Sequence, residues 1–291
     1  MTLGISGCSK YNNLVNVEVV ESFEDMVFDE KKSIYDIKSY IDENISSTND
    51  LEMSSSMVNT YIYALYQNVE KYINIVSELQ DDFACLESEL NLDEITVSDL
   101  SKIPREYKLV RAIVEELKEC QFILFKENNA YTVDVDIQEI SNRYSKYVNK
   151  DTLEYLKFRV EERAFNVYDI NSDTYDIKAL MKTIDTVIEK MNELEGSSQK
   201  NNWVETLTYY LNIFTSRTQE TFVDKDKRLV PNILKEMREY QKSHANSEFV
   251  KFIKEYTDIL EINNYETNSE PVRAFLEGID SELESFLIEK K

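Results

Sequence analysis

Glycine and proline are scarce in this chain, with four glycines and three prolines among 291 residues. This scarcity argues against glycine-rich phosphate-binding loops, Rossmann-like domains and β-sandwiches, which need many turn residues. With few helix breakers, the 42% of hydrophobic residues favour long helices around a substantial core. We therefore expect an all-α fold, a bundle of about eight to ten helices built from long antiparallel hairpins.

Histidine occurs once, as His244, and cysteine three times. One histidine cannot supply the paired Glu-x-x-His motifs of di-iron bundles or the His-Glu-x-x-His motif of zincins, and three cysteines make no zinc site. His244 lies at a predicted helix end, where a cation interacts favourably with the helix dipole. We expect an exposed histidine there, and no catalytic residue, metal or cofactor elsewhere.

Two stretches imitate functional motifs. Residues 169–173 resemble the start of an EF-hand loop, but Thr174 stands where glycine is needed and Leu180 where the last glutamate ligand is needed. The Ser-x-x-Lys pattern from Ser197 to Lys200 lacks the other motifs of penicillin-recognising enzymes. We expect a helix-capping loop and a linker at these places, and a protein that is not an enzyme.

Acidic residues outnumber basic ones by 56 to 33, which gives a net charge of −23. Such a surface repels nucleic-acid backbones and anionic lipid headgroups, so we expect no nucleic-acid partner. It would attract a basic protein or a cationic wall polymer. Solubility alone would also account for the charge.

The longest helical pattern runs from Met57 to Leu90, and from Leu65 onward its apolar residues alternate at spacings of four and three. This heptad seam predicts one uninterrupted helix, about 50 Å long, that packs along its whole length. A second helix is predicted from Pro104 to Asn129, and the two should form an antiparallel hairpin. Residues 130–136 alternate like a strand, but no partner strand is visible, so we expect an extended lead-in.

The chain divides into a remnant of a signal and tether (1–13), an N-terminal helical half (14–170) and a C-terminal helical half (171–291). One continuous domain over 14–291 is the alternative. The sequence from Tyr35 to Lys38 recurs from Tyr175 to Lys178. Two related halves would explain this echo, and so would chance in a helix-rich composition.

Nineteen tyrosines give the chain many amphipathic aromatic side chains. Several cluster on the two most comparable predicted helices and occupy more than one face, so they could form a partner surface or the rim of the core. The candidate partner-surface residues are Tyr61, Tyr63, Tyr66, Tyr209 and Tyr210.

The N-terminal sequence Ile5-Ser6-Gly7-Cys8 resembles the lipobox of bacterial lipoproteins. The resemblance implies that Cys8 carries a diacylglycerol and becomes the first residue of the mature protein, followed by a polar tether. A complete signal would need a basic and an apolar region before the box, so the resemblance implies a true start upstream of Met1, and a chance match at an ordinary N-terminus with a free cysteine is the alternative. The remaining Cys85 and Cys120 could form a disulfide, and we expect them to be buried thiols.

These observations favour two functions. The first is a surface-anchored bacterial lipoprotein that binds or scaffolds outside the cytoplasm, without catalysis, and contacts the membrane through the lipid on Cys8. The alternative is an acidic intracellular interaction protein, of the phage or mobile-element type, that binds a basic partner. An enzyme would need a carboxylate site assembled across helices, which spacing along the sequence does not reveal.

Overall fold

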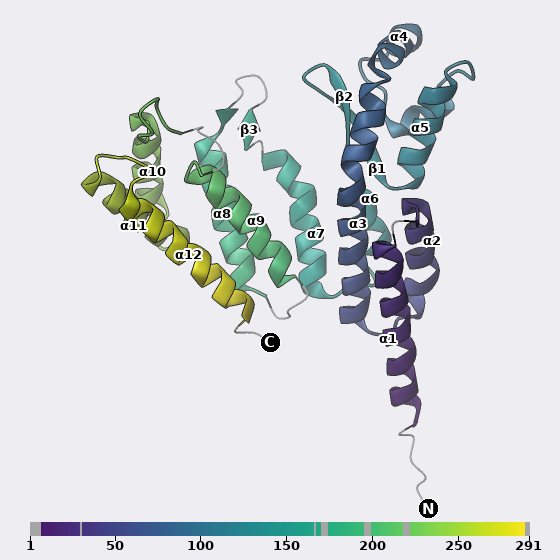
Figure 1. Ribbon diagram of the computed structural model, residues 1–291, viewed down its shortest axis with the longest axis horizontal. Helices are drawn as coiled ribbons and strands as arrows, with labels where there is room; N and C mark the ends of the chain where they lie inside the picture. Colours follow the sequence, from purple (N-terminus) through teal and green to yellow (C-terminus); the bar gives the residue numbers. More distant parts are fainter. Residues whose placement is uncertain are drawn as a thin grey trace, which may run out of the picture. The chain divides into compact units, whose positions relative to one another are not determined.

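The fold is all-α, as the sequence predicts. The computed structural model describes residues 7–29, 31–165, 167–169, 174–194, 199–217 and 222–288. Over these ranges the chain forms twelve α-helices and two small β-hairpins, and the fold is 71% helical (Figure 1). It divides into two compact units, Met1–Lys157 and Phe158–Lys291, with the division inside helix α7 (Lys150–Glu162).

The first unit is organised around α3 (Leu51–Ser77), which packs against α1 (Gly7–Phe28) and α2 (Ile34–Asn44) (Figure 1). Side-chain caps fix where two of these helices begin. Ser33 accepts a hydrogen bond from the backbone of the first turn of α2, and Asp50 does the same for α3. Each cap satisfies a backbone N–H that would otherwise lack a partner.

The predicted single helix from 57 to 90 is wrong, because it is two helices. α3 ends at Ser77, and α4 (Gln80–Leu90) begins after Leu79, whose φ of −106° and ψ of 11° leave the helical region. The Gln80 side chain donates to the Tyr131 carbonyl at 2.9 Å and accepts from the Tyr131 N–H at 2.7 Å. A helix start that pairs with a neighbouring strand in this way interrupts the heptad seam.

The predicted helix from 104 to 129 is correct only in its middle. α5 (Lys108–Glu119) ends before Gln121, whose φ of 61° is left-handed. Arg111 donates to the carbonyls of Leu100 and Ile103, both at 3.1 Å. These bonds tie α5 to the preceding segment, which contains a 3-10 helix (Val97–Ser101), and Tyr72 of α3 donates to Glu116 of α5 at 2.8 Å.

A β-hairpin follows α5, where an extended lead-in is predicted. Strand β1 (Phe122–Glu127) pairs antiparallel with β2 (Ala130–Val135), and the hairpin packs on α3. Asn128 and Asn129 have φ values of 51° and 61°, which two-residue hairpin turns of type I′ require. The apolar residues of β1 also fit a helical stripe, so the sequence does not reveal β1 as the strand that pairs with residues 130–135.

Helix α6 (Ile137–Tyr144) is joined to α2 by one carboxylate. Arg143 donates to both oxygens of Asp42, at 2.7 and 2.6 Å, and Tyr144 and Lys38 donate at 2.8 and 2.9 Å. Burial would raise the pKa of Asp42, but these hydrogen bonds outweigh it and the pKa lies below its usual value.

The second unit is a small hairpin followed by five helices. α8 packs against α9, α10 and α11, and α12 packs against α9 and α11. Buried aromatic side chains of α9 and α11 fill the core, and Phe214 lies 5.3 Å from Phe249 between ring centroids. The elements are β3 (Tyr168–Asp169), β4 (Thr174–Tyr175), α8 (Ile177–Asn192), α9 (Lys200–Phe214), α10 (Pro231–Ser243), α11 (Glu248–Ile262) and α12 (Glu270–Ile288).

The repeated sequence Tyr-Asp-Ile-Lys takes different positions in the two units. Asp36 lies in the first turn of α2 and completes a capping box with Ser33. Its counterpart Asp176 is itself the N-cap of α8 and accepts from two backbone N–H groups. Because the two copies differ by three helix positions, the echo does not mark equivalent structure.

Candidate partner-binding surfaces

The predicted tyrosine surface of the first unit is reduced to Tyr63 and Tyr66. Tyr61 is fully buried and donates to Gln121 at 3.0 Å, so its prediction as a partner-facing residue is wrong. Tyr63 is 50% exposed and lies 6.3 Å from the ring of Phe28, which is 68% exposed. Tyr66 is half-buried. The surface therefore carries one exposed aromatic pair, from α1 and α3.

In the second unit, only one of the two predicted tyrosines faces solvent. Tyr210 is buried and donates to Glu162, so its prediction as a surface residue is wrong. Tyr209 is 56% exposed, and burial of its hydroxyl end beside Tyr175 raises its pKa to about 12. Tyr168 stacks edge-on against Tyr175 at 5.0 Å. The β3–β4 hairpin and α9 thus present a small aromatic surface.

A groove of about 410 Å³ lies between α4 and the start of α5. Its walls carry three carboxylates, those of Asp82, Glu89 and Glu106, against one cation, Lys108. Asp82 and Glu89 are seven residues apart on α4, so they lie on one face of that helix. The groove therefore concentrates negative charge within a concave surface.

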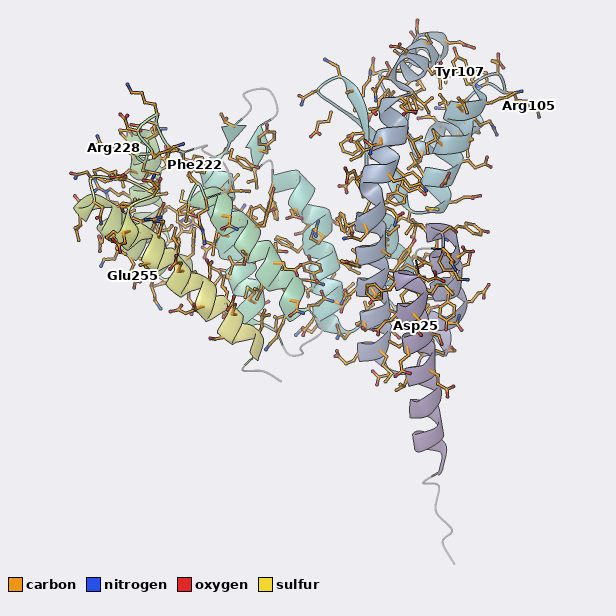
Figure 2. The ribbon with its side chains drawn as sticks, viewed as in Figure 1. Asp25, Arg105, Tyr107, Phe222, Arg228 and Glu255 are labelled. Carbon is orange, nitrogen blue, oxygen red and sulfur yellow. The ribbon has the colours of Figure 1, made fainter. Side chains whose placement is uncertain are left out.

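Tyr107 and Leu109 give this groove its apolar part. Tyr107 lies beside α4 and α5 and donates to Glu89 at 2.9 Å (Figure 2). That hydrogen bond raises the pKa of Tyr107 and holds the tyrosine ring against the wall. Leu109 is 70% exposed, an unusual position for a leucine at a groove of charged residues. An acidic rim around an exposed leucine suits a basic, apolar partner.

Sequence reasoning missed this groove for a physical reason. Asp82 reads as solvated helix charge in the sequence, and Leu109 falls outside the apolar stripe of its predicted helix. The groove forms where α4 and the start of α5 lie side by side. Their placement depends on the connecting chain from Asn91 to Tyr107, which contains the 3-10 helix. One sequence feature could have indicated an exposed apolar residue here. Leu109 stands at a helix start, next to Val110 of the apolar stripe and therefore off that stripe.

The three cysteines lie in different environments. Cys8 lies in the first turns of α1, so the helix begins where a tether is predicted, and its side chain is outside the described part of the structure. Cys85 and Cys120 are free thiols, and no disulfide joins them. Cys120 is buried as predicted, and burial raises its pKa to about 11. Cys85 is exposed, so its predicted burial is wrong.

The remaining candidates are His244 and the two stretches that imitate functional motifs. His244 is the exposed C-cap of α10, as predicted, and stacks on Tyr240 at 4.0 Å. Residues 170–173 of the EF-hand-like stretch, and Ser197 and Ser198 of the Ser-x-x-Lys motif, lie outside the described residues, whereas Lys200 begins α9 and is buried. Among the residues that the structure describes, no group of three His, Cys, Asp or Glu side chains could hold a metal ion. No helix in the same ranges is long and apolar enough to cross a membrane.

Comparisons with protein-family models, with curated proteins and with solved structures find no match to this chain.

Proposed function

We propose that the protein is a non-catalytic binding or scaffolding protein that receives a basic partner in the groove between α4 and α5. The observation that carries this proposal is the exposed leucine, Leu109, set among three carboxylates. The partner segment has lysine or arginine residues on either side of an aliphatic side chain. The net charge of −23 draws such a segment toward the protein from a distance.

The apolar and charged parts of the groove have different roles in binding. Covering Leu109 removes an aliphatic side chain from water, which contributes about 1.5–3 kcal/mol. The carboxylates of Asp82 and Glu106 lie at the rim, where ion pairs contribute mainly to association rate and partner choice. Binding should therefore weaken steeply as salt is added, because salt screens exposed charges.

A lipid on Cys8 would hold the protein at the outer face of the bacterial membrane. This part of the proposal rests on the lipobox-like sequence from Ile5 to Cys8. One diacyl anchor would retain a protein whose acidic surface the anionic headgroups repel. In the alternative, the same groove serves a basic partner inside the cell, and only the location differs.

A basic peptide tests the groove. A fluorescent peptide of alternating lysine and leucine should bind the native protein, and fluorescence anisotropy measures its Kd. Replacing Leu109→Ser together with Asp82→Asn should weaken binding about tenfold or more, because the apolar contact and one rim charge are lost.

The control removes matching groups elsewhere. Ile262 is 82% exposed on α11 and Glu205 is exposed on α9, so Ile262→Ser with Glu205→Gln makes the same change in charge and apolarity. This control should leave the Kd within about twofold of native. Equal weakening by both double variants would mean that net charge alone binds the peptide, and the groove proposal would fail.

Location is tested separately, by membrane fractionation and intact-mass measurement of the protein from its native host. A mature chain that begins at a diacylglycerol-modified Cys8 supports the lipoprotein. An unmodified chain in the soluble fraction overturns it and leaves the intracellular alternative.

A further inference from the structure

The second unit contains a basic cavity, although the chain as a whole is strongly acidic. The cavity has a volume of about 480 Å³, within the range of small-molecule sites. Among the described residues of its walls are three cations, Arg217, Lys227 and Arg273, and one carboxylate, Glu277. Because acidic residues outnumber basic ones by 56 to 33 overall, this reversal of sign is local.

Three segments that are far apart in the sequence form the walls. They are the turn after α9, the loop before α10, and the connection from α11 into α12, and Figure 2 labels Phe222 and Arg228 on the second of these. Thr267 donates to the Lys227 carbonyl through both its N–H and its hydroxyl, at 3.0 Å each. Leu229 donates to the Tyr265 carbonyl at 2.9 Å. These bonds hold the loops in place around the cavity.

Two of the cations are arranged to receive a ligand. Arg217 donates to both oxygens of Asp280, at 2.7 and 3.1 Å, which fixes the orientation of its guanidinium. Those bonds use two of the five N–H donors of an arginine, so three remain. Arg273 is exposed, and its side chain has no hydrogen-bond or ion-pair partner among the described residues.

A buried hydroxyl lines the same cavity. The Oγ atom of Ser216 is inaccessible to water and has no hydrogen-bond partner in the described ranges of the chain. Leaving such a group without a partner destabilises the fold, because the hydroxyl loses its hydrogen bonds to water on burial and gains none in return. Rotation of the Ser216 side chain toward the cavity that this residue lines would bring the hydroxyl to a ligand oxygen and remove this cost. Val223 and the buried Leu276 supply apolar wall beside it.

We propose that this cavity binds the phosphate of a small soluble phosphomonoester. Arginine forks and hydroxyls are the donors that bind phosphate oxygens in proteins. The lining stays positive even with the Arg217 charge paired to Asp280, and so attracts a phosphomonoester, which carries close to two negative charges at neutral pH. The volume leaves room for a few carbon atoms beyond the phosphate, and these contact Val223 and Leu276.

Isothermal titration calorimetry with glycerol phosphate at pH 7.5 tests the proposal on the full chain. We expect one molecule to bind per chain. Arg273→Gln should weaken binding about tenfold or more, and Ser216→Gly about threefold to tenfold, since each removes a donor to the phosphate. Glycine suits position 216 because its φ is 57°.

The matched control is Arg238→Gln, which removes the same charge from α10 outside the cavity and should leave the Kd within about twofold. Absence of binding, equal weakening by Arg238→Gln, or binding of citrate in place of glycerol phosphate would each overturn the proposal. Vesicles that contain phosphatidic acid form a second arm. Binding to vesicles without binding of soluble glycerol phosphate would also overturn it, because the ligand would then be a lipid headgroup.

Discussion

At the scale of single residues, the two described thiols differ most clearly in reactivity. Cys85 is exposed on α4, whereas Cys120 is buried and its pKa is raised to about 11. A thiol reagent at pH 8 attacks the accessible thiolate. In a Cys8→Ser chain we therefore predict that one thiol reacts at once and the second only after unfolding, as a chromogenic disulfide reagent would show. Two fast thiols would contradict the burial of Cys120.

Asp42 is the residue whose charge state should matter most for stability in the first unit. Its carboxylate accepts from Arg143, Tyr144 and Lys38, and its pKa is lowered despite burial. Replacing Asp42→Asn should reduce the free energy of unfolding at pH 7 by about 1–3 kcal/mol, since bonds to a charged acceptor are lost. Urea titration of both chains measures the difference.

The direction of the pKa shift of Asp42 decides how this stability difference depends on pH. A lowered folded-state pKa means that Asp42 stabilises the fold fully above the unfolded pKa of about 4 and loses the contribution as pH falls through the folded value. The gap between native and Asp42→Asn should therefore shrink below about pH 4. A gap that is unchanged at pH 3 would mean that packing, and not charge, is lost in the variant.

The tyrosines show how far residue-level prediction reaches. Tyr61 and Tyr63 are two positions apart, so on a helix they point to nearly opposite sides. Tyr61 shares its face with Leu65, a member of the predicted seam, and this alone indicates burial. Tyr210 carries the same signal, because it lies three residues after Leu207 and four before Phe214 on the buried face of α9.

At the scale of elements, the β1–β2 turn gives a direct test. Asn128 and Asn129 both adopt positive φ. Glycine takes this conformation without strain, whereas a β-branched residue does not. We predict that Asn129→Gly keeps or slightly raises the melting temperature, while Asn129→Val lowers the free energy of unfolding by about 1–2 kcal/mol.

Calorimetry of the two variants checks this turn. Equal melting temperatures for the glycine and valine chains would mean that the hairpin contributes nothing to the cooperative fold of the first unit.

The all-α fold class is predictable from the sequence, because long stretches with helical apolar spacing lack glycine and proline. The breaks are less predictable, since they depend on partners that are distant in sequence. The amide of Gln80 pairs with Tyr131, fifty-one residues away, and so separates α3 from α4. The groove between α4 and α5 and the basic cavity are both formed by segments that are separated in the sequence. Apolar periodicity along the chain does not predict which segments come into contact.

At the scale of the whole molecule, each unit contains its own core and a convenient reporter. Trp203 is the single tryptophan and is buried in the second unit, whereas Cys120 is buried in the first. We predict that Asp42→Asn lowers the urea midpoint for exposure of Cys120 and leaves the midpoint of Trp203 fluorescence unchanged. Equal shifts of both midpoints would show that the chain unfolds as one cooperative body.

The proposed site of the basic partner is the groove between α4 and α5. Cys85 lies three residues after Asp82 and four before Glu89 on α4, so it shares the helix face that carries these two groove residues. The most direct measurement is the rate of Cys85 modification, in a Cys8→Ser chain, with and without the lysine–leucine peptide at saturation. We predict a several-fold slower reaction when the peptide is bound. An unchanged rate at full saturation would place the peptide elsewhere and contradict the account.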